Sequence, residues 1–248
     1  MDIDRHNIEI HQNKEHWHRK PVLSKIYTQF YRRIADHLSR GQNRKIVELG
    51  SGIGNLKQVI PACICTDLFP NPWIDQVENA YRLSFQDHSV SDLVLFDVFH
   101  HLRYPGTALE ECYRVLRPGG RLILFEPCVS ILGRIVYGIL HHEPLGLHQD
   151  IEWFAPENWK PEEIDYYASQ ANAWRIFISE NFKDRLTHWD IVSIIRLSAL
   201  SYVASGGFSK PQFYPDFAYP FMQLLDRIGD TMPYFFATRL LVVMEKST

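Results

Sequence analysis

The sequence contains few of the features that mark disulfide-rich or metal-clustering proteins. Its 248 residues include four cysteines, Cys63, Cys65, Cys112 and Cys128, without metal-ligand spacing or the density of a disulfide framework. This pattern predicts buried, reduced thiols. Cys63 and Cys65 fall in an expected strand, and we expect their side chains to point to opposite faces of the sheet.

Long apolar runs and an excess of charge of either sign are also missing. The stretches 129–140 and 191–204 are too short to span a bilayer, and each contains an arginine. The polar start of the chain is unlike a signal peptide, so a cytoplasmic protein is expected. A net charge of −3 and a pI of about 6.4 leave no broad basic surface, which argues against a nucleic-acid partner.

What the sequence does contain is an alternation of apolar strands and amphipathic helices. Strands are expected at 45–49, 62–66, 92–97, 121–126 and 238–245. Helices are expected at 22–40, 55–60, 107–116, 129–141, 188–204 and 216–228, with a turn at 117–120. The alternation up to residue 126 predicts an α/β fold with a doubly wound, mostly parallel sheet.

We expect a single domain over residues 1–248, because no linker, repeat or low-complexity tract divides the chain. Its expected parts are an N-terminal helical cap at 1–41, a cofactor-binding core at 42–127, an insert and cap region at 128–237 and a terminal strand at 238–248. Long irregular inserts after a sheet strand are commonly lids or substrate loops. The choice of substrate is therefore expected to depend on residues 128–237.

The most informative segment is 46–54, which reads Ile-Val-Glu-Leu-Gly-Ser-Gly-Ile-Gly. Small residues after a buried strand let a ligand approach the backbone, as dinucleotides and S-adenosylmethionine both do. The glycine spacing is one residue shorter than the dinucleotide fingerprint, and Pro61 closes the helix that follows. Asp67 ends the next strand, where its carboxylate can accept hydrogen bonds from both hydroxyls of a ribose.

Five segments, in order, resemble the class I S-adenosylmethionine-dependent methyltransferases, and most closely the type 11 subgroup typified by ubiquinone and menaquinone methyltransferases. They are Val47-Glu-Leu-Gly-Ser-Gly-Ile-Gly54, Thr66-Asp67, Leu83-Ser-Phe-Gln-Asp-His-Ser-Val90, Phe96-Asp-Val-Phe-His-His-Leu102 and Leu116-Arg-Pro-Gly-Gly-Arg-Leu122. The resemblance covers about residues 45–127. It implies a Rossmann-like methyltransferase fold and S-adenosylmethionine as the cofactor.

By that resemblance, the three glycines approach the methionine part of the cofactor, Glu48 braces their turn, and Asp67 binds the ribose. Leu68 packs on the adenine. Asn79 stands where the family usually has an aspartate that binds the adenine amine, and its amide oxygen can accept the same bond. The full set of implied cofactor residues is Glu48, Gly50, Ser51, Gly52, Gly54, Asp67, Leu68, Asn79, Ala80, Asp97, Val98 and His100.

Histidines supply the candidates for the remaining chemistry. His100 and His101 could act as a general base, since imidazole titrates near neutral pH, although positioning and packing are the alternative roles. The candidates for a polar substrate pocket, with a solvated loop as the alternative, are His141, His142, Glu143 and His148. Their spacing matches no recognised metal site, so no metal is expected. The segment 16–18 and the helix after it would either cover the cofactor or pack on the sheet.

The sequence therefore predicts methyl transfer from S-adenosylmethionine to a small-molecule substrate, at an oxygen or carbon of a sugar, lipid, isoprenoid or similar acceptor. The Asn/Asp-Pro-Pro-Tyr/Phe motif of nucleic-acid amino methylases is absent after residue 96. A nicotinamide-dependent oxidoreductase and a non-catalytic S-adenosylmethionine-binding protein are the alternatives. The apolar stretch 129–141 would also fit a contact with a membrane surface.

Overall fold

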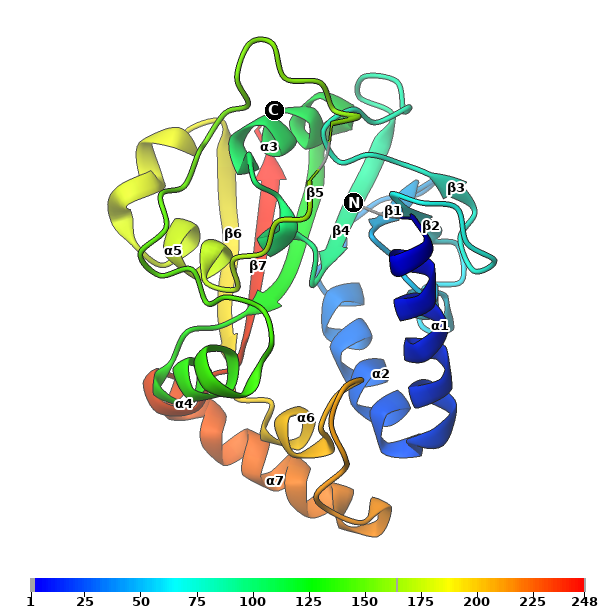
Figure 1. Ribbon diagram of the computed structural model, residues 1–248. Helices are drawn as coiled ribbons and strands as arrows, with labels where there is room; N and C mark the ends of the chain where they lie inside the picture. The colour runs from blue at the N-terminus through cyan, green and yellow to red at the C-terminus, as the bar shows by residue number, and fades with distance from the viewer. Residues whose placement is uncertain (1–2, 164, 248) are drawn as a thin grey trace.

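The computed structural model describes residues 3–163 and 165–247, which form a seven-stranded sheet flanked by helices (Figure 1). Met1, Asp2, Ile164 and Thr248, which the expected domain ranges include, lie outside the described residues. The strands are Ile46–Leu49 (β1), Ile64–Asp67 (β2), Gln76–Val77 (β3), Val90–Phe96 (β4), Leu116–Pro127 (β5), Trp189–Leu197 (β6) and Arg239–Lys246 (β7). The α-helices are Ile3–Arg19 (α1), Pro21–Ala35 (α2), Pro105–Val115 (α3), Ile131–Ile135 (α4), Asn172–Phe177 (α5), Leu200–Ser205 (α6), Tyr219–Asp230 (α7) and Pro233–Phe236 (α8). Shorter helical turns lie at Asn55–Gln58 (η1), Phe99–His101 (η2), Val136–Leu140 (η3), Glu180–Arg185 (η4) and Asp216–Ala218 (η5).

The strand order is β3-β2-β1-β4-β5-β7-β6. Strands β1 to β5 pair in parallel, and β7 runs antiparallel to both β5 and β6. The chain moves outward from β1 through β3 and then returns to place β4 on the other side of β1. Open α/β sheets bind ligands at such a reversal, outside the carboxyl ends of the strands. The doubly wound, mostly parallel α/β fold predicted from the sequence is confirmed.

Helices bury both faces of the sheet, which is why β1 and β4 are apolar almost throughout. On one face, Phe30 of α2 packs against Phe125 of β5 with ring centroids 4.9 Å apart. On the other, Leu109 of α3 and Ile176 of α5 join the same buried cluster as Leu93 of β4. Burying such side chains is worth about 1.5–3 kcal/mol each, so the two clusters fix the sheet that carries the site.

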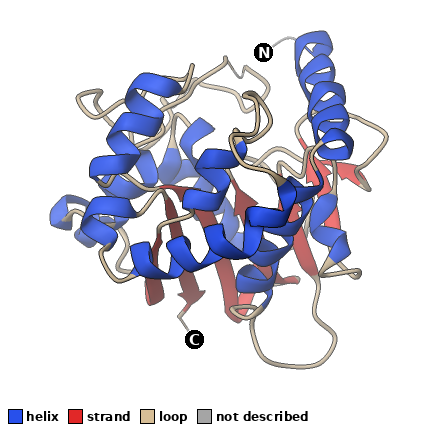
Figure 2. Ribbon diagram, turned by 90° about the horizontal axis from the view of Figure 1, so that it is seen from below, coloured by secondary structure: helices blue, strands red, loops and turns tan. Residues whose placement is uncertain are grey.

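The helices of the C-terminal half gather beyond the carboxyl ends of β4 and β5. In Figure 1 the helices α4, α6 and α7 lie below the sheet, and the view from below in Figure 2 shows helices across this end of the strands. None of the described helices is long and apolar enough to cross a membrane.

The structure corrects several expected elements. The expected helix at 188–204 is wrong, because this stretch forms the edge strand β6 and the short helix α6. The expected helix at 129–141 is divided into α4 and the π turn η3. Strand β5 begins at Leu116, and the expected turn at 117–120 bulges from it, since Val90 pairs with Leu116 and Asp92 with Arg121.

The N-terminal region also differs from the expectation. Helix α2 ends at Ala35, before the predicted end at residue 40. The polar segment before it, which belongs to the expected helical cap at 1–41, forms a long helix of its own, α1, although a helix was expected only at 22–40. The two helices lie side by side along the sheet (Figure 1). As a result, the start of α1 reaches the carboxyl ends of β1 and β2.

Candidate functional site

The glycine turn after β1 lies against the end of β4. Gly50, Gly52 and Gly54 have φ angles of 68°, 53° and 65°, in the left-handed region that favours glycine. A Cβ atom on Gly50 would lie 2.4 Å from Cγ2 of Val98. Glycine therefore lets the ends of two neighbouring strands meet.

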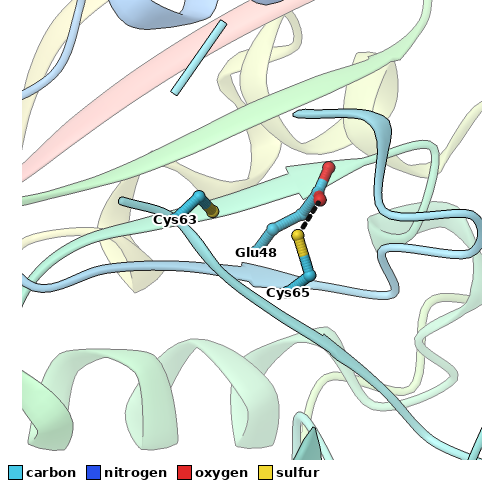
Figure 3. A group of neighbouring side chains, drawn as sticks. All are labelled: Glu48, Cys63 and Cys65. Atoms are coloured by element: carbon cyan, nitrogen blue, oxygen red, sulfur yellow. Dashed lines mark hydrogen bonds between the residues drawn. The ribbon is translucent and has the colours of Figure 1, made fainter. Parts of the chain in front are cut away.

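Glu48 supports this turn from below, through its backbone carbonyl. That carbonyl accepts hydrogen bonds from the hydroxyls of Ser51 at 3.2 Å and Thr66 at 2.8 Å. The Glu48 carboxyl is buried and accepts a bond from the Cys65 thiol at 3.6 Å (Figure 3). Burial raises the pKa of the Glu48 carboxyl well above its usual value.

Cys63 and Cys65 point to the same side of β2 (Figure 3). Their sulfur atoms and a carboxylate oxygen of Glu48 all lie within 4.8 Å of one another. The expectation that the two thiols face opposite ways is wrong, because residues two apart along a strand share a face. All four cysteines are buried and free, as expected.

Asp67, at the end of β2, is bonded directly to the glycine turn. Its Oδ2 accepts the amide of Gly52 at 2.9 Å, and its Oδ1 accepts the amide of Leu68 at 2.7 Å. The side chain is 7% exposed. A carboxylate has about four lone-pair sites; two amides take one on each oxygen and His6 faces Oδ1, so a site on Oδ2 stays open for the hydroxyl of a ligand.

The start of helix α1 covers Asp67 and the turn. Nε2 of His6 lies 3.4 Å from Oδ1 of Asp67, and the imidazole packs edge-on against Phe69. A Cβ atom on Gly52 would meet Cδ1 of Ile10 at 3.5 Å. The segment 16–18, which the sequence analysis considered as a cover, is turned away, since Trp17 packs on Tyr27 and Phe208.

A hollow of about 410 Å³ opens beside Asp67. Leu68 and Asn79, both expected near the adenine, line it together with Phe69 and Arg82. The Asn79 amide nitrogen donates to the carbonyl of Pro161 at 2.7 Å, and its oxygen accepts the amide of Tyr81 at 3.0 Å. This amide oxygen keeps a second lone pair for a ligand. The neighbouring Ala80 is half-buried and packs against the main core, not into the hollow.

Two buried residues, Glu126 and Arg239, hold the chain at the end of β4. Glu126 of β5 accepts the amides of Val98 and Phe99 at 2.9 and 2.7 Å. Asp97 has a φ angle of 55° and pairs with the guanidinium of Arg239, which is 2% exposed. Sequence reasoning missed both Glu126 and Arg239, because each comes from a strand distant in the chain. A charged residue inside an apolar strand was the available signal.

The histidine pair after β4 meets Glu143 from the insert. Nε2 of His100 and Nε2 of His101 lie 3.7 Å from the two Glu143 oxygens, respectively Oε2 and Oε1. The same carboxylate accepts hydrogen bonds from the Tyr166 hydroxyl at 2.6 Å and from the Gln170 amide. The structure thus brings three of the sequence-predicted candidates together.

The two histidines are in opposite electrostatic situations. Burial lowers the pKa of His100, but the Glu126 carboxylate 2.6 Å from its Nδ1 outweighs burial and raises that pKa to about 10. Burial and repulsion from His100 lower the pKa of His101 to about 4. Burial raises the pKa of Glu143, but the neighbouring histidines and the hydrogen bond from the Tyr166 hydroxyl outweigh burial and lower that pKa. His101 is therefore the neutral imidazole of the pair at neutral pH.

The other candidates from the insert are divided by the structure. Nδ1 of His141 lies 3.8 Å from Oε2 of Glu143, so His141 belongs to the cluster. His142 is exposed and stacks on His141 with ring centroids 4.6 Å apart, while His148 is exposed on the loop that follows. Neither His142 nor His148 is placed beside the histidine pair.

Residues 47–124, which carry the glycine turn, Asp67 and the histidine pair, match the family described as a methyltransferase domain. These residues, about a third of the chain, have the sequence pattern and the fold of a class I methyltransferase domain. The match does not separate the ubiquinone and menaquinone subgroup from other members. Among curated proteins, the probable polyketide synthase 10 of Dictyostelium discoideum is 26% identical over 110 residues, which make up 44% of this chain and 4% of that protein.

Solved structures share the fold of this methyltransferase domain over most of the chain. A chain of the complex that contains the Haloferax volcanii Trm112 methyltransferase activator has a TM-score of 0.53 at 17% identity, covering 95% of this chain and 94% of that chain. Geranyl diphosphate C-methyltransferase from Streptomyces coelicolor A3(2), in complex with Mg²⁺, geranyl-S-thiolodiphosphate and S-adenosyl-L-homocysteine, has a TM-score of 0.51 at 14% identity. That match covers 88% of this chain and 76% of the other. At these identities the similarity establishes the fold alone.

The contact of α1 with the methyltransferase core should depend on pH. Burial lowers the pKa of His6, but the Asp67 carboxylate outweighs it, so the folded pKa lies above 6.5; Glu9 is the other charged group acting on it. The stabilisation is then full below the unfolded pKa of about 6.5 and is lost as the pH rises through the folded pKa. Chemical denaturation should give the wild type a higher free energy of unfolding than His6→Gln at about pH 6. The difference between the two free energies should shrink as the pH increases to about 9. A difference that is constant or widens over this range would contradict the His6–Asp67 contact.

Proposed function

We propose that this protein binds S-adenosylmethionine at the glycine turn and transfers its methyl group to a small-molecule acceptor. The observation that carries the proposal is the direct bond between Asp67 and Gly52, beside the hollow lined by Leu68 and Asn79. A cofactor with a charged tail, a ribose and an adenine needs these three parts in this order.

The residues fit such a cofactor part by part. The glycines of the turn let the methionine part approach the backbone closely, and the open lone pair on Oδ2 of Asp67 suits a ribose hydroxyl. Leu68 offers an apolar surface to the adenine, and the Asn79 oxygen can accept from its amine. When bound, S-adenosylmethionine supplies a methyl group on a sulfonium, which is a good leaving group.

The chain's own contribution to methyl transfer would be alignment and control of a proton. Holding an acceptor in line with the methyl group supplies much of the rate by proximity alone. An oxygen or acidic carbon acceptor must also lose a proton. Of the two candidate bases, His101 suits that role better, because it is the neutral imidazole of the pair and its side chain is 35% exposed. His100 is buried between two carboxylates and suits positioning.

Titration calorimetry with S-adenosylmethionine, S-adenosylhomocysteine and NADH tests this proposal against a nicotinamide-dependent oxidoreductase. We expect both adenosyl ligands to bind at micromolar concentrations and NADH not to bind. Binding of NADH alone would overturn the proposal. A non-catalytic cofactor-binding protein would instead bind the adenosyl ligands and form no S-adenosylhomocysteine with sugar, lipid or isoprenoid alcohol acceptors.

Asp67→Ala should weaken the binding of S-adenosylhomocysteine by about 1.5–3 kcal/mol, which is the worth of hydrogen bonds to a charged group. Calorimetry measures this loss directly. Asp75→Ala is the matched control, since Asp75 likewise accepts a backbone amide, that of Cys65 at 2.8 Å, but lies outside the proposed site. Equal affinities of Asp67→Ala and the wild type would remove Asp67 from the site.

A further inference from the structure

In the cluster of His100, His101 and Glu143, the imidazole nitrogens approach the carboxylate without reaching hydrogen-bond distance. Two imidazole nitrogens face the Glu143 carboxylate from 3.7 Å each, which is beyond hydrogen-bond distance. The three ligand atoms lie within 4.8 Å of one another. They come from η2 after β4 and from the loop after η3, so the fold brings together groups distant in the sequence.

The opposite nitrogen of each imidazole is fixed by a hydrogen bond. Nδ1 of His100 lies 2.6 Å from the Glu126 carboxylate, and Nδ1 of His101 lies 2.9 Å from the carbonyl of Tyr167. Both partners can only accept, so each Nδ1 carries a hydrogen and donates it. Metal-binding histidines are held in this way, with a carboxylate or carbonyl behind the ring to orient the free Nε2.

A bound cation accounts for the way the imidazole nitrogens face the Glu143 carboxylate. His101, the neutral imidazole of the pair, donates from Nδ1 and presents a lone pair at Nε2, which the facing carboxylate oxygen repels. An ion between these two groups converts the repulsion into two bonds. His100 would release its Nε2 proton on binding the same ion, as metal binding to a protonated histidine requires. Ligands of a tetrahedral zinc ion, each about 2.1 Å from the metal, lie about 3.4 Å apart, close to the spacing observed here.

We propose that His100, His101 and Glu143 bind a divalent transition-metal ion of the zinc type. Two imidazoles and one carboxylate are a ligand set that catalytic zinc sites use, with a further position left for water or substrate. The side chain of His101 is 35% exposed, whereas that of His100 is 4% exposed, so the site opens to solvent on the His101 side. The sequence analysis expected no metal, because the ligands share no local spacing.

The open position also indicates which acceptor the enzyme takes, a step that rests on the proposed function. With its Nε2 bound to the ion, His101 no longer serves as the base; a hydroxyl oxygen bound to the ion instead loses its proton to solvent more readily, as metal-bound water does. Its lone pair then forms the new oxygen–carbon bond. The carbon–sulfur bond breaks with its electron pair remaining on sulfur, which leaves the thioether S-adenosylhomocysteine. The metal site therefore selects an acceptor alcohol over a carbon acceptor.

Metal binding is tested without cofactor or acceptor. Tag-free protein is stripped with chelator and titrated with Zn²⁺ alone by calorimetry, and the absorption of the Co²⁺ form reports the ligand set. We expect one equivalent of Zn²⁺ in the wild type and an affinity lower by roughly a hundredfold in His101→Ala and in Glu143→Gln. His142→Ala is the matched control and should bind Zn²⁺ as the wild type does, since His142 is exposed and lies outside the cluster.

The outcomes of these titrations support or overturn the metal site. Absence of stoichiometric Zn²⁺ binding, or equal affinity in all three variants and the wild type, overturns the metal site. Titration of S-adenosylhomocysteine into the same variants keeps the two proposals separate. The affinity for S-adenosylhomocysteine should be unchanged within a few fold in these variants. Loss of Zn²⁺ binding with retained S-adenosylhomocysteine binding therefore supports the metal site. Loss of both ligands indicates misfolding, which the far-UV spectrum of Glu143→Gln checks.

Discussion

Replacing Gly52 with valine should abolish the binding of S-adenosylmethionine while the protein still folds. The φ angle of 53° at this position is strained for a side chain with a Cβ, at a cost of about 1–2 kcal/mol. Within the protein a Cβ finds room, because its nearest neighbour, Cδ1 of Ile10, is 3.5 Å away. The added branches instead occupy the space in which the cofactor would approach the turn. Calorimetry with S-adenosylhomocysteine measures the loss.

Gly119→Val supplies the control for backbone strain. Gly119 has a φ angle of 69°, and no atom lies within 4 Å of a Cβ placed there. Both variants should therefore lose similar stability in thermal denaturation, and only Gly52→Val should lose the ligand. Retained affinity in Gly52→Val would show that the glycine turn is a structural connection and not the cofactor site.

Replacing Arg239 with leucine should cost about 3 kcal/mol of unfolding free energy, at the lower end of the range for breaking a buried ion pair. The guanidinium is 2% exposed and pairs with Asp97, whose side chain is 29% exposed. It also lies 4.4 Å from the centre of the Tyr202 ring. Without it, Asp97 loses its guanidinium partner at the end of β4. Urea denaturation measures the change.

Arg121→Leu is the comparison for Arg239→Leu. Arg121 pairs with Glu245 at 2.9 Å across the neighbouring strands, but the two side chains are 20% and 32% exposed. Partly solvated pairs of this kind contribute about 1 kcal/mol or less. If Arg239→Leu were as mild as Arg121→Leu, Asp97 would not depend on the buried arginine.

Strands β1, β2, β4 and β5 were predictable because they contain short apolar runs between glycine, proline and aspartate, whereas the two-residue strand β3 was not expected. The edge strand β6 was not, because an apolar run such as 188–204 fits a buried helix as well as a strand. The β-branched residues Ile191, Val192, Ile194 and Ile195 were the local signal for a strand. Pairing with β7 decides the matter, and that pairing joins segments about forty residues apart.

The candidate site likewise has a part that the sequence predicts and a part that only the fold brings together. The glycine turn and Asp67 follow from local spacing along β1 and β2, which the sequence displays directly. The convergence of Glu143 on His100 and His101 depends on the path of the insert after β5. Arg239 reaches Asp97 only because β7 enters the sheet antiparallel, next to β5. Such contacts are set by topology and cannot be read from composition or periodicity.

The central claim is that the glycine turn, Asp67 and the hollow beside it form one cofactor site covered by α1. Hydrogen exchange measured by mass spectrometry, with and without S-adenosylhomocysteine, tests it most directly, because ligand contact slows the exchange of the amides it covers. We predict slower exchange in peptides spanning 46–58, 64–80 and the start of α1, with no change around 219–230. No protection in these segments at saturating ligand, or protection confined to other parts of the chain, would contradict the account.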